Sequence, residues 1–299
     1  MLPGRLRRDG IGLLHGTVNA LPAAWRGPAV ATILDLTFLL MPQAFNRGNR
    51  TYLSWAVRLA ARKANRIITI SDATRRDVIR LLGVPEERVR RIYCGVEGRF
   101  TPLRGTIELA EFRARRGLPD DFILYLGTME PRKNVGRLVQ AYAELRRRGE
   151  TAAPLVLAGG KGWGEEAIFA EVERSGYAMD IRYVGYVPEE EMPLWYNAAT
   201  FFVYPSEYEG FGLPPLEAMA CGTPVITSDS SSLPEVVGDA GILVDPKDTD
   251  AITDAMQRLI ANPSLRSELA ECGPRRASTF TWKRMAAETL AVYREVSGS

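Results

Sequence analysis

The chain has 299 residues, of which 46% are hydrophobic and 25% charged, the composition of a globular protein of roughly two domains. Its formal charge is only +2, so no nucleic-acid partner is indicated, although the positive charge lies mainly in the first third. Three widely spaced cysteines and a single histidine argue against a disulfide framework and a metal site. Without an apolar run long enough to span a membrane or a recognisable signal segment, we expect a cytoplasmic protein.

The first hundred residues alternate short apolar runs with segments of helical period, the pattern of a parallel sheet with crossover helices. The pattern predicts strands at Ile11–Leu14, Ala29–Leu34, Arg66–Ile70 and Val89–Tyr93, and helices at Thr51–Lys63 and Thr74–Leu82. A domain of this class usually opens with a strand and a glycine-rich turn, whereas Met1 leads almost directly into what resembles a middle strand. We therefore expect an incomplete N-terminal domain over residues 1–103.

Two features of this first part have alternative interpretations. His15 ends the first predicted strand and could face a cleft, but a lone histidine is more often a satisfied structural group. The helix at Thr51–Lys63 could rest on an anionic membrane, because in it and directly beside it apolar residues (Tyr52, Leu53, Trp55, Val57, Leu59) occur with basic ones (Arg50, Arg58, Arg62, Lys63, Arg66). A core-packed helix with a basic outer face is the interpretation we favour. Peripheral membrane contact stays open.

The stretch from Gly98 to Pro119 mixes glycine, proline and charged residues, which places a domain boundary near residue 103. A second domain, 104–281, follows, and its near-continuously apolar runs predict strands buried on both faces. They are Phe122–Leu126, Pro154–Ala158, Ile181–Val184, Thr200–Tyr204, Pro224–Thr227 and Gly241–Val244. Helices are predicted between them at Val135–Arg147, Glu189–Asn197 and Asp250–Ala261. A last helix, Trp282–Val296 within residues 282–299, could cross back to the first domain.

The segment from Gly127 to Asn134 follows the first of these strands. Arg132 offers a planar guanidinium fork and Lys133 a compact charge, the two groups best suited to phosphate oxygens. Together they could neutralise a leaving diphosphate without a metal. The alternative is a solvated basic turn capped by Asn134.

The densest signal is the segment Glu209–Glu217, which comes soon after the strand ending at Tyr204. Gly210 and Gly212 allow a ligand to approach the backbone closely, and two prolines suit the first turn of a helix. A helix start beyond the carboxyl ends of parallel strands is a place where phosphate binds. Glu217 could accept hydrogen bonds from a ribose diol, and Glu209 would lie near a transferred sugar. A surface helix residue and a loop charge are the alternative interpretations.

Farther along, Asp248 and Asp250 imitate a metal-binding Asp-x-Asp pair. They precede a helix, where aspartate is a favoured cap. We interpret them as a cap and predict no metal and no cofactor.

From residue 11 to 299 the chain resembles glycosyltransferase family 4, a retaining family with the α/β GT-B fold of two Rossmann-like domains with parallel sheets. The resemblance is carried by SEYEGFGLPPLEAMACGTPVI with its two glutamates, LYLGTMEPRKN, LVLAGGKGW, RYVGYVPEEEMPLWYNAA, SSLPEVVGDAGILVDP and IITISDATRRDVIRLLGVPEERV. It implies an acceptor-side N-terminal domain and a donor-binding C-terminal domain. Mannosyltransferase-like members that use GDP-mannose are most similar, and rhamnosyl- and glucosyltransferases share much of the pattern.

The resemblance also implies roles for individual residues. Glu217 would hold the ribose, Arg132 and Lys133 the diphosphate, and Tyr186 and Val187 the base. Glu209 with the backbone of Gly210, Phe211, Gly212 and Leu213 would contact sugar and phosphate, with Gly127 and Thr128 also lining the donor site. Glu209, Lys133 and Arg132 would be the catalytic residues. The acceptor would be a hydroxyl of a glycan or a lipid-linked molecule.

Three departures from the family pattern stand out. Leu34 replaces a histidine expected to face the transferred sugar, and Cys94 stands where Asn or Pro is common. The opening strands and the glycine-rich loop of the N-terminal domain are missing. The short N-terminal domain and Leu34 motivate an alternative hypothesis, a non-catalytic or impaired nucleotide-sugar-binding subunit. A sugar-nucleotide epimerase on a similar scaffold is a third possibility, but one histidine poorly meets its usual need for acid and base groups.

Overall fold

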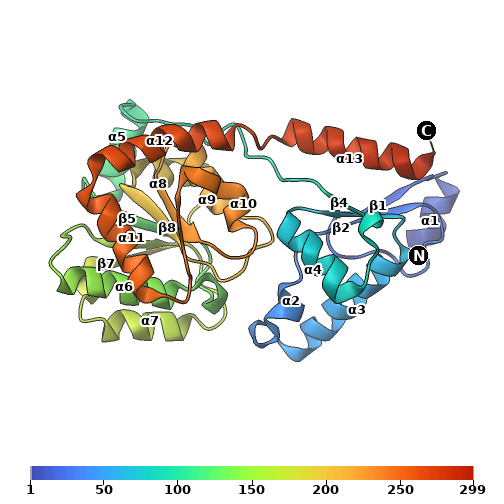
Figure 1. Ribbon diagram of the computed structural model, residues 1–299, viewed down its shortest axis with the longest axis horizontal. Helices are drawn as coiled ribbons and strands as arrows, with labels where there is room; N and C mark the ends of the chain where they lie inside the picture. The colour runs from blue at the N-terminus through green and yellow to red at the C-terminus, as the bar shows by residue number, and fades with distance from the viewer. Residues whose placement is uncertain (1, 299) are drawn as a thin grey trace. The chain divides into compact units, whose positions relative to one another are not determined.

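The computed structural model describes residues 2–298 and divides them into two compact units. The first unit contains residues 2–95, 209–211 and 281–298, and the second contains residues 96–208 and 212–280. Each unit is built on its own parallel sheet (Figure 1), as the alternation of apolar runs and helical segments predicts. None of the described helices combines the length and the apolar character that a membrane span requires.

The sheet of the first unit has four strands among the described residues, in the order β1 (Leu14–Gly16), β2 (Ala29–Ile33), β3 (Arg66–Thr69) and β4 (Val89–Arg91). The strand predicted at Ile11–Leu14 is wrong except for its last residue. The Ile11 N–H is held by the carbonyl of Leu6 at 3.0 Å, at the end of helix α1 (Leu2–Arg8), so the strand begins only at Leu14. His15 therefore lies in the middle of β1.

Between the strands of this sheet lie the helices α2 (Thr37–Leu40), α3 (Arg47–Lys63) and α4 (Asp72–Leu82). The last two begin earlier than predicted because of their caps: the side chain of Asn46 accepts from the Asn49 N–H, and that of Ser71 from the Thr74 N–H. Short 3₁₀ turns lie at Pro42–Ala44 and Glu86–Arg88. The buried face of α3 packs with β2 in the main core of this unit.

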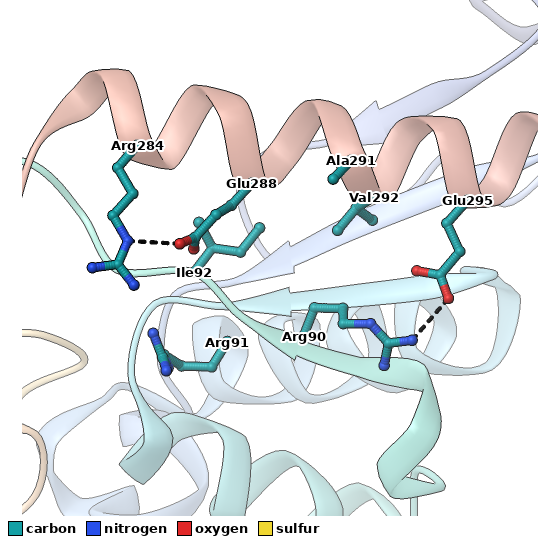
Figure 2. Close-up of a pocket in the computed structure, with 8 residues that line it drawn as sticks. All are labelled: Arg90, Arg91, Ile92, Arg284, Glu288, Ala291, Val292 and Glu295. Carbon is teal, nitrogen blue, oxygen red and sulfur yellow. Dashed lines mark hydrogen bonds and ion pairs between the residues drawn. The ribbon is translucent and has the colours of Figure 1, made fainter. Parts of the chain in front are cut away.

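The C-terminal helix α13 (Trp282–Ser297) belongs to the first unit. Alternate residues of a strand point to opposite faces, and Val30 of β2 points away from the main core into a second cluster with Ile68, Ile92 and Val292 of α13. A cavity of about 330 Å³ lies between β4 and α13. Figure 2 shows two of its arginines, Arg90 and Arg284, turned toward carboxylates. Arg284 and Glu288 pair within α13 at 2.7 Å, whereas Arg90 of β4 pairs with Glu295 of α13 at 2.8 Å, so the second pair helps to attach α13 to the sheet.

The sheet of the second unit has six parallel strands among the described residues, in the order β10-β9-β8-β5-β6-β7. They are β5 (Ile123–Leu126), β6 (Leu155–Ala158), β7 (Ile181–Gly185), β8 (Phe201–Tyr204), β9 (Val225–Ser228) and β10 (Ile242–Val244). All six predicted strands are confirmed within one or two residues at each end. Four of them (β5, β6, β8 and β9) are buried along their whole length.

Helices cover both faces of this sheet (Figure 1). One group is α6 (Val135–Arg147) with the two helices that contact it, α7 (Glu165–Arg174) and α11 (Thr249–Ala261). The other is α5 (Ile107–Arg116), α8 (Met192–Ala198), α9 (Leu213–Ala220), α10 (Leu233–Val237) and α12 (Pro263–Ala277). Shorter 3₁₀ turns are Pro131–Lys133, Ala178–Asp180, Glu189–Glu191 and Gly238–Ala240. The side chain of Asp248 caps α11 by accepting from the Ala251 N–H at 3.0 Å, which confirms the interpretation of Asp248 as a cap.

The chain passes from the first unit to the second between Gly95 and Val96, ahead of the boundary that composition places at residue 103. Side-chain hydrogen bonds hold the intervening segment in the second unit. The Asn197 amide donates to the carbonyl of Thr101 at 3.0 Å and accepts from the N–H of Leu103 at 2.6 Å. Local composition cannot reveal a contact with a residue so distant in the chain.

Candidate active site

The second sheet has a topological switch point between β5 and β8. The chain adds β6 and β7 on one side of β5 and then returns to add β8, β9 and β10 on the other. Ligands of open parallel sheets bind beyond the carboxyl ends of the strands at such a point. The two segments that leave this edge at the switch point are residues 127–134 after β5 and residues 205–208 after β8.

Close backbone packing shapes this edge. Gly159, which follows β6, has φ +134°, and a Cβ there would lie 2.0 Å from the carbonyl oxygen of Gly127. Only glycine fits at such a conformation and separation. Thr128 is exposed beside this contact, and its carbonyl accepts from the hydroxyl of Tyr125 at 3.0 Å. The glycines thus bring the two loops together and leave Thr128 facing outward.

Arg132 joins the two segments at the switch point. Its guanidinium donates to the carbonyl of Tyr208 at 2.6 Å, and its own carbonyl accepts from the Glu207 N–H at 3.0 Å and the Ser206 hydroxyl at 3.3 Å. Its side chain is 18% exposed and also pairs with Glu130 at 3.5 Å. The basic turn is therefore folded against the segment after β8. A solvated turn is the wrong description of it.

Lys133 lies over a buried aromatic ring. Its Nζ donates to the hydroxyl of Tyr204, the last residue of β8, and lies 5.1 Å from the ring centroid. Tyr204 is fully buried and stacks on Tyr125 with centroids 5.9 Å apart. Asn134 does not cap the following helix through its side chain, which instead donates to the carbonyl of Pro246 at 2.6 Å. The position of the ammonium group is thus fixed by a rigid part of the sheet.

Helix α9 begins at this edge. Gly212 precedes it with φ +117°, and Leu213, at 36% exposure, opens it. Pro214 and Pro215 occupy the first turn as expected and carry no N–H. The Leu216 N–H is used within the helix, because it donates to the carbonyl of Gly212 at 3.3 Å. Since the two prolines have no N–H, an anion at this helix start would meet the N–H of Leu213.

Glu217 lies on the next turn of α9. Its carboxylate accepts a hydrogen bond from the hydroxyl of Tyr196 at 3.0 Å. Burial is the main influence on this group and raises the pKa of Glu217 to about 7, while the hydrogen bond from Tyr196 and the charge of Arg99 act in the opposite direction. Burial also raises the pKa of Tyr196 well above its ordinary value. Glu217 is therefore a carboxylate that ionises near neutral pH.

The remaining donor-site residues of the second unit follow β7. Tyr186 is 73% exposed and Val187 is buried, so the two side chains point in different directions from one loop. A Cβ built on Gly160 would lie 3.9 Å from the ring of Tyr186, which places that ring beside the loop after β6. Gly127, Thr128, Arg132, Lys133, Tyr186, Val187, Gly212, Leu213 and Glu217 thus all lie in segments that follow strands of the second sheet.

Glu209, Gly210 and Phe211 group with the first unit. There the hydroxyl of Thr74 donates to the carbonyl of Gly210 at 3.2 Å, and the buried ring of Phe211 lies 5.8 Å from that of Tyr93. A Cβ on Gly210 would lie 2.3 Å from the carbonyl oxygen of Leu34, a second reason for glycine here. Gly210 and Phe211 thus have structural roles, and their part in donor binding stays a prediction.

His15 is a structural residue. Its ring nitrogens are hydrogen-bonded to the hydroxyls of Tyr293 at 2.6 Å and Thr32 at 2.7 Å, and burial lowers the pKa of His15. Cys94 is a buried free thiol. Burial raises the pKa of Cys94 to about 11, so this thiol is a poor nucleophile.

Within residues 2–298, no group of three His, Cys, Asp or Glu side chains is placed to hold a metal ion. Metal independence stays a prediction.

Two family models match the chain. The model of the glycosyl transferases group 1 covers residues 108–276, more than half of the chain, and the model named Glycosyltransferase Family 4 covers residues 2–98. The chain belongs to the group 1 glycosyltransferases. It is thus an enzyme of the glycosyltransferase class, as the sequence resemblance implies.

Individual relatives agree with this assignment. The O-antigen chain mannosyltransferase B of Escherichia coli is 38% identical over 266 residues, which cover 89% of this glycosyltransferase and 70% of the relative. The serotype-specific mannosyltransferase WbdA of Escherichia coli is 32% identical over 227 residues, 75% of this chain and only 28% of WbdA. Among solved structures, sucrose-phosphate synthase from Thermosynechococcus elongatus superimposes with a TM-score of 0.82 at 27% identity, over 98% of this chain and 76% of that one. The expected GT-B fold is confirmed.

Residues that the sequence interpretation did not single out also shape the site of this glycosyltransferase. Tyr204 and Tyr196 contact Lys133 and Glu217, respectively, and Ser206 is fully buried against the Arg132 carbonyl. One signal was available for Tyr204: a polar group at the carboxyl end of an otherwise apolar strand. No local sequence pattern indicates Tyr196, because its helix is separated from Glu217 in the chain.

Proposed function

We propose that this glycosyltransferase moves a sugar from a nucleoside diphosphate donor to a hydroxyl of a glycan or lipid-linked acceptor, with GDP-mannose as the donor. The observation that carries the proposal is the arrangement at the switch point, where Arg132 and Lys133 fold against the segment after β8, on the same sheet whose β8–β9 connection carries Glu217. Two relatives named mannosyltransferases, 38% and 32% identical, support mannose. Their names alone favour this sugar over glucose or rhamnose.

In the proposed mechanism the chain acts by position and charge. Lys133 and Arg132 stabilise the negative charge that develops on the diphosphate, and Glu217 accepts hydrogen bonds from the ribose. Glu209 with the backbone of residues 210–213 orients the sugar, and the base rests near Tyr186 and Val187. The bond from the anomeric carbon to the diphosphate oxygen breaks as the acceptor oxygen bonds to the same face of that carbon. The acceptor proton passes to the departing phosphate oxygen. Configuration is retained because the new bond forms on the face that the diphosphate leaves, and the proposal gives no step to a metal.

The test is transfer by the Lys133→Ala variant, with GDP-mannose as donor and water or a simple mannoside as acceptor. Loss of one preorganised charge at the leaving group should lower turnover about 10²- to 10³-fold while the melting temperature stays close to that of the wild type. Lys247→Ala is the matched control, because Lys247 is an exposed lysine on the loop after β10.

Several outcomes would redirect the proposal. Unchanged turnover in Lys133→Ala would remove this lysine from the mechanism. Nucleotide binding by the wild type without any transfer or donor hydrolysis would favour a non-catalytic binding subunit. Melting shifts with GDP, UDP and dTDP identify the carrier, and NMR of the product anomer tests retention.

A further inference from the structure

The charge of the chain is strongly segregated. The first 71 residues contain ten basic side chains and two acidic ones, although the whole chain carries a formal charge of only +2. Between Asp35 and Asp72 the sequence has six basic residues and no acidic residue. The later part of the chain is therefore net acidic. A charge asymmetry of this size indicates an anionic partner for the N-terminal part.

Helix α3 carries much of this charge and has two distinct faces. Ala56, Val57, Ala60 and Ala61 are buried, and Val57, Ala60 and Ala61 pack in the core of the first unit. At 3.6 residues per turn the opposite side presents the residues that we call the outer face of α3: Arg47, Thr51, Tyr52, Trp55, Arg58 and Arg62. All six are exposed, and the helix contains no acidic residue that could neutralise them.

Core packing explains the inner face of α3 but not the aromatic residues of the outer face. Tyr52 is 61% exposed and Trp55 is 53% exposed, with ring centroids 6.3 Å apart. Trp55 lies near the middle of the outer face, with arginines on one side of it and Tyr52 on the other. Large exposed aromatic side chains surrounded by arginines are typical of surfaces that meet a membrane–water interface.

We propose that the outer face of α3 docks on an anionic lipid surface, with Arg47, Arg58 and Arg62 at the headgroups and Trp55 and Tyr52 at the interface. The lipid is favoured over a nucleic acid because the exposed basic and aromatic side chains lie along one face of a single helix, which matches a plane better than it tracks a phosphate backbone. Since the apolar face of α3 is already used in the core, the contact is shallow and depends on charge. Such docking would keep the enzyme beside a lipid-linked acceptor.

The test is co-sedimentation of the full chain with vesicles of phosphatidylcholine and phosphatidylglycerol in equal parts. We expect binding to these vesicles at low salt, weak binding to phosphatidylcholine alone, and loss of binding as salt is raised. Each basic residue near an anionic surface contributes about a fivefold change in partition, so Arg58→Ala with Arg62→Ala should weaken binding about 25-fold. Trp55→Ala should weaken binding at every salt concentration.

Matched controls lie on the second unit. Arg258→Ala removes an exposed arginine of α11, and Met179→Ala removes an apolar side chain that is 99% exposed. Both should bind vesicles as the wild type does, and all variants should keep its melting temperature and nucleotide affinity. Equal vesicle binding by wild type and the α3 variants would overturn the proposal. So would an absence of vesicle binding together with α3-dependent binding of a single-stranded RNA.

Discussion

At the scale of single residues, the Glu217 carboxylate and the Tyr196 hydroxyl form a coupled pair, 3.0 Å apart, in the second unit. Burial raises the pKa of Glu217 from 4.5 to about 7, so the fold favours the protonated form. The contribution of this group to stability is full below pH 4.5 and is lost as the pH rises through about 7. Ribose hydroxyls need an acceptor, however, so the proposed role in binding requires the ionised form.

Tyr196→Phe tests this coupling. The hydrogen bond from Tyr196 lowers the pKa of Glu217, so its loss moves the ionisation of Glu217 to higher pH. Calorimetric titration with GDP across the neutral range should show wild-type affinity rising through about pH 7 and the variant rising later. Glu217→Gln is the control, because its affinity should be lower and should lack this pH dependence. A pH profile for Tyr196→Phe identical to that of the wild type would remove Tyr196 as the group that positions Glu217.

The sequence pattern predicts the correct strands before Arg132, Lys133 and Glu217, because each of these residues follows a short apolar run with glycine or proline nearby. It could not predict what these residues touch. Arg132 contacts Tyr208, and Glu217 contacts Tyr196. Such pairs depend on which strands become neighbours, and no local pattern encodes that choice.

At the scale of elements, the loops after β5 and β6 are held together by a backbone contact that needs glycine. Gly159→Ala would bring a Cβ to 2.0 Å from the Gly127 carbonyl oxygen at φ +134°. We expect a loss of about 3 kcal/mol in unfolding free energy from overpacking and backbone strain together, with weaker nucleotide binding. Chemical denaturation measures the first effect and calorimetry the second.

Gly136→Ala is the matched control for that substitution. Gly136 lies in α6 with nothing within 4 Å of a built Cβ, so alanine there should stabilise the protein by about 0.5 to 1 kcal/mol. A Gly159→Ala variant as stable as the wild type would show that the two loops can separate without cost. The close contact would then have no part in shaping the site.

The predicted elements of the second sheet were accurate because continuous apolar runs bounded by turns are distinctive for buried parallel strands. Helix starts were less accurate. Asn46 and Ser71 are the caps that move α3 and α4 to earlier starts, and a cap is decided by one side chain. The first strand was displaced because Ile11 is used to end α1 through its bond to Leu6.

At the scale of the whole molecule, the first unit is assembled from distant parts of the chain. Residues 209–211 and 281–298 join residues 2–95 in it. Helix α13 attaches through Val292 and through the hydrogen bond between Tyr293 and His15. The sequence indicates two parallel-sheet domains, but contacts between such distant segments lie beyond any local pattern.

The central claim is that a nucleoside diphosphate sugar binds at the carboxyl edge of the second sheet, around its switch point. The same sheet offers a competing site at its opposite edge, where a cavity of about 310 Å³ is lined by residues that include Asp121, Thr151 and Arg266. Hydrogen exchange followed by mass spectrometry, with and without GDP-mannose, distinguishes the two edges. We predict protection of residues 127–134 and 205–217 with no change at 150–154 and 199–201. Protection confined to the latter segments would contradict the account.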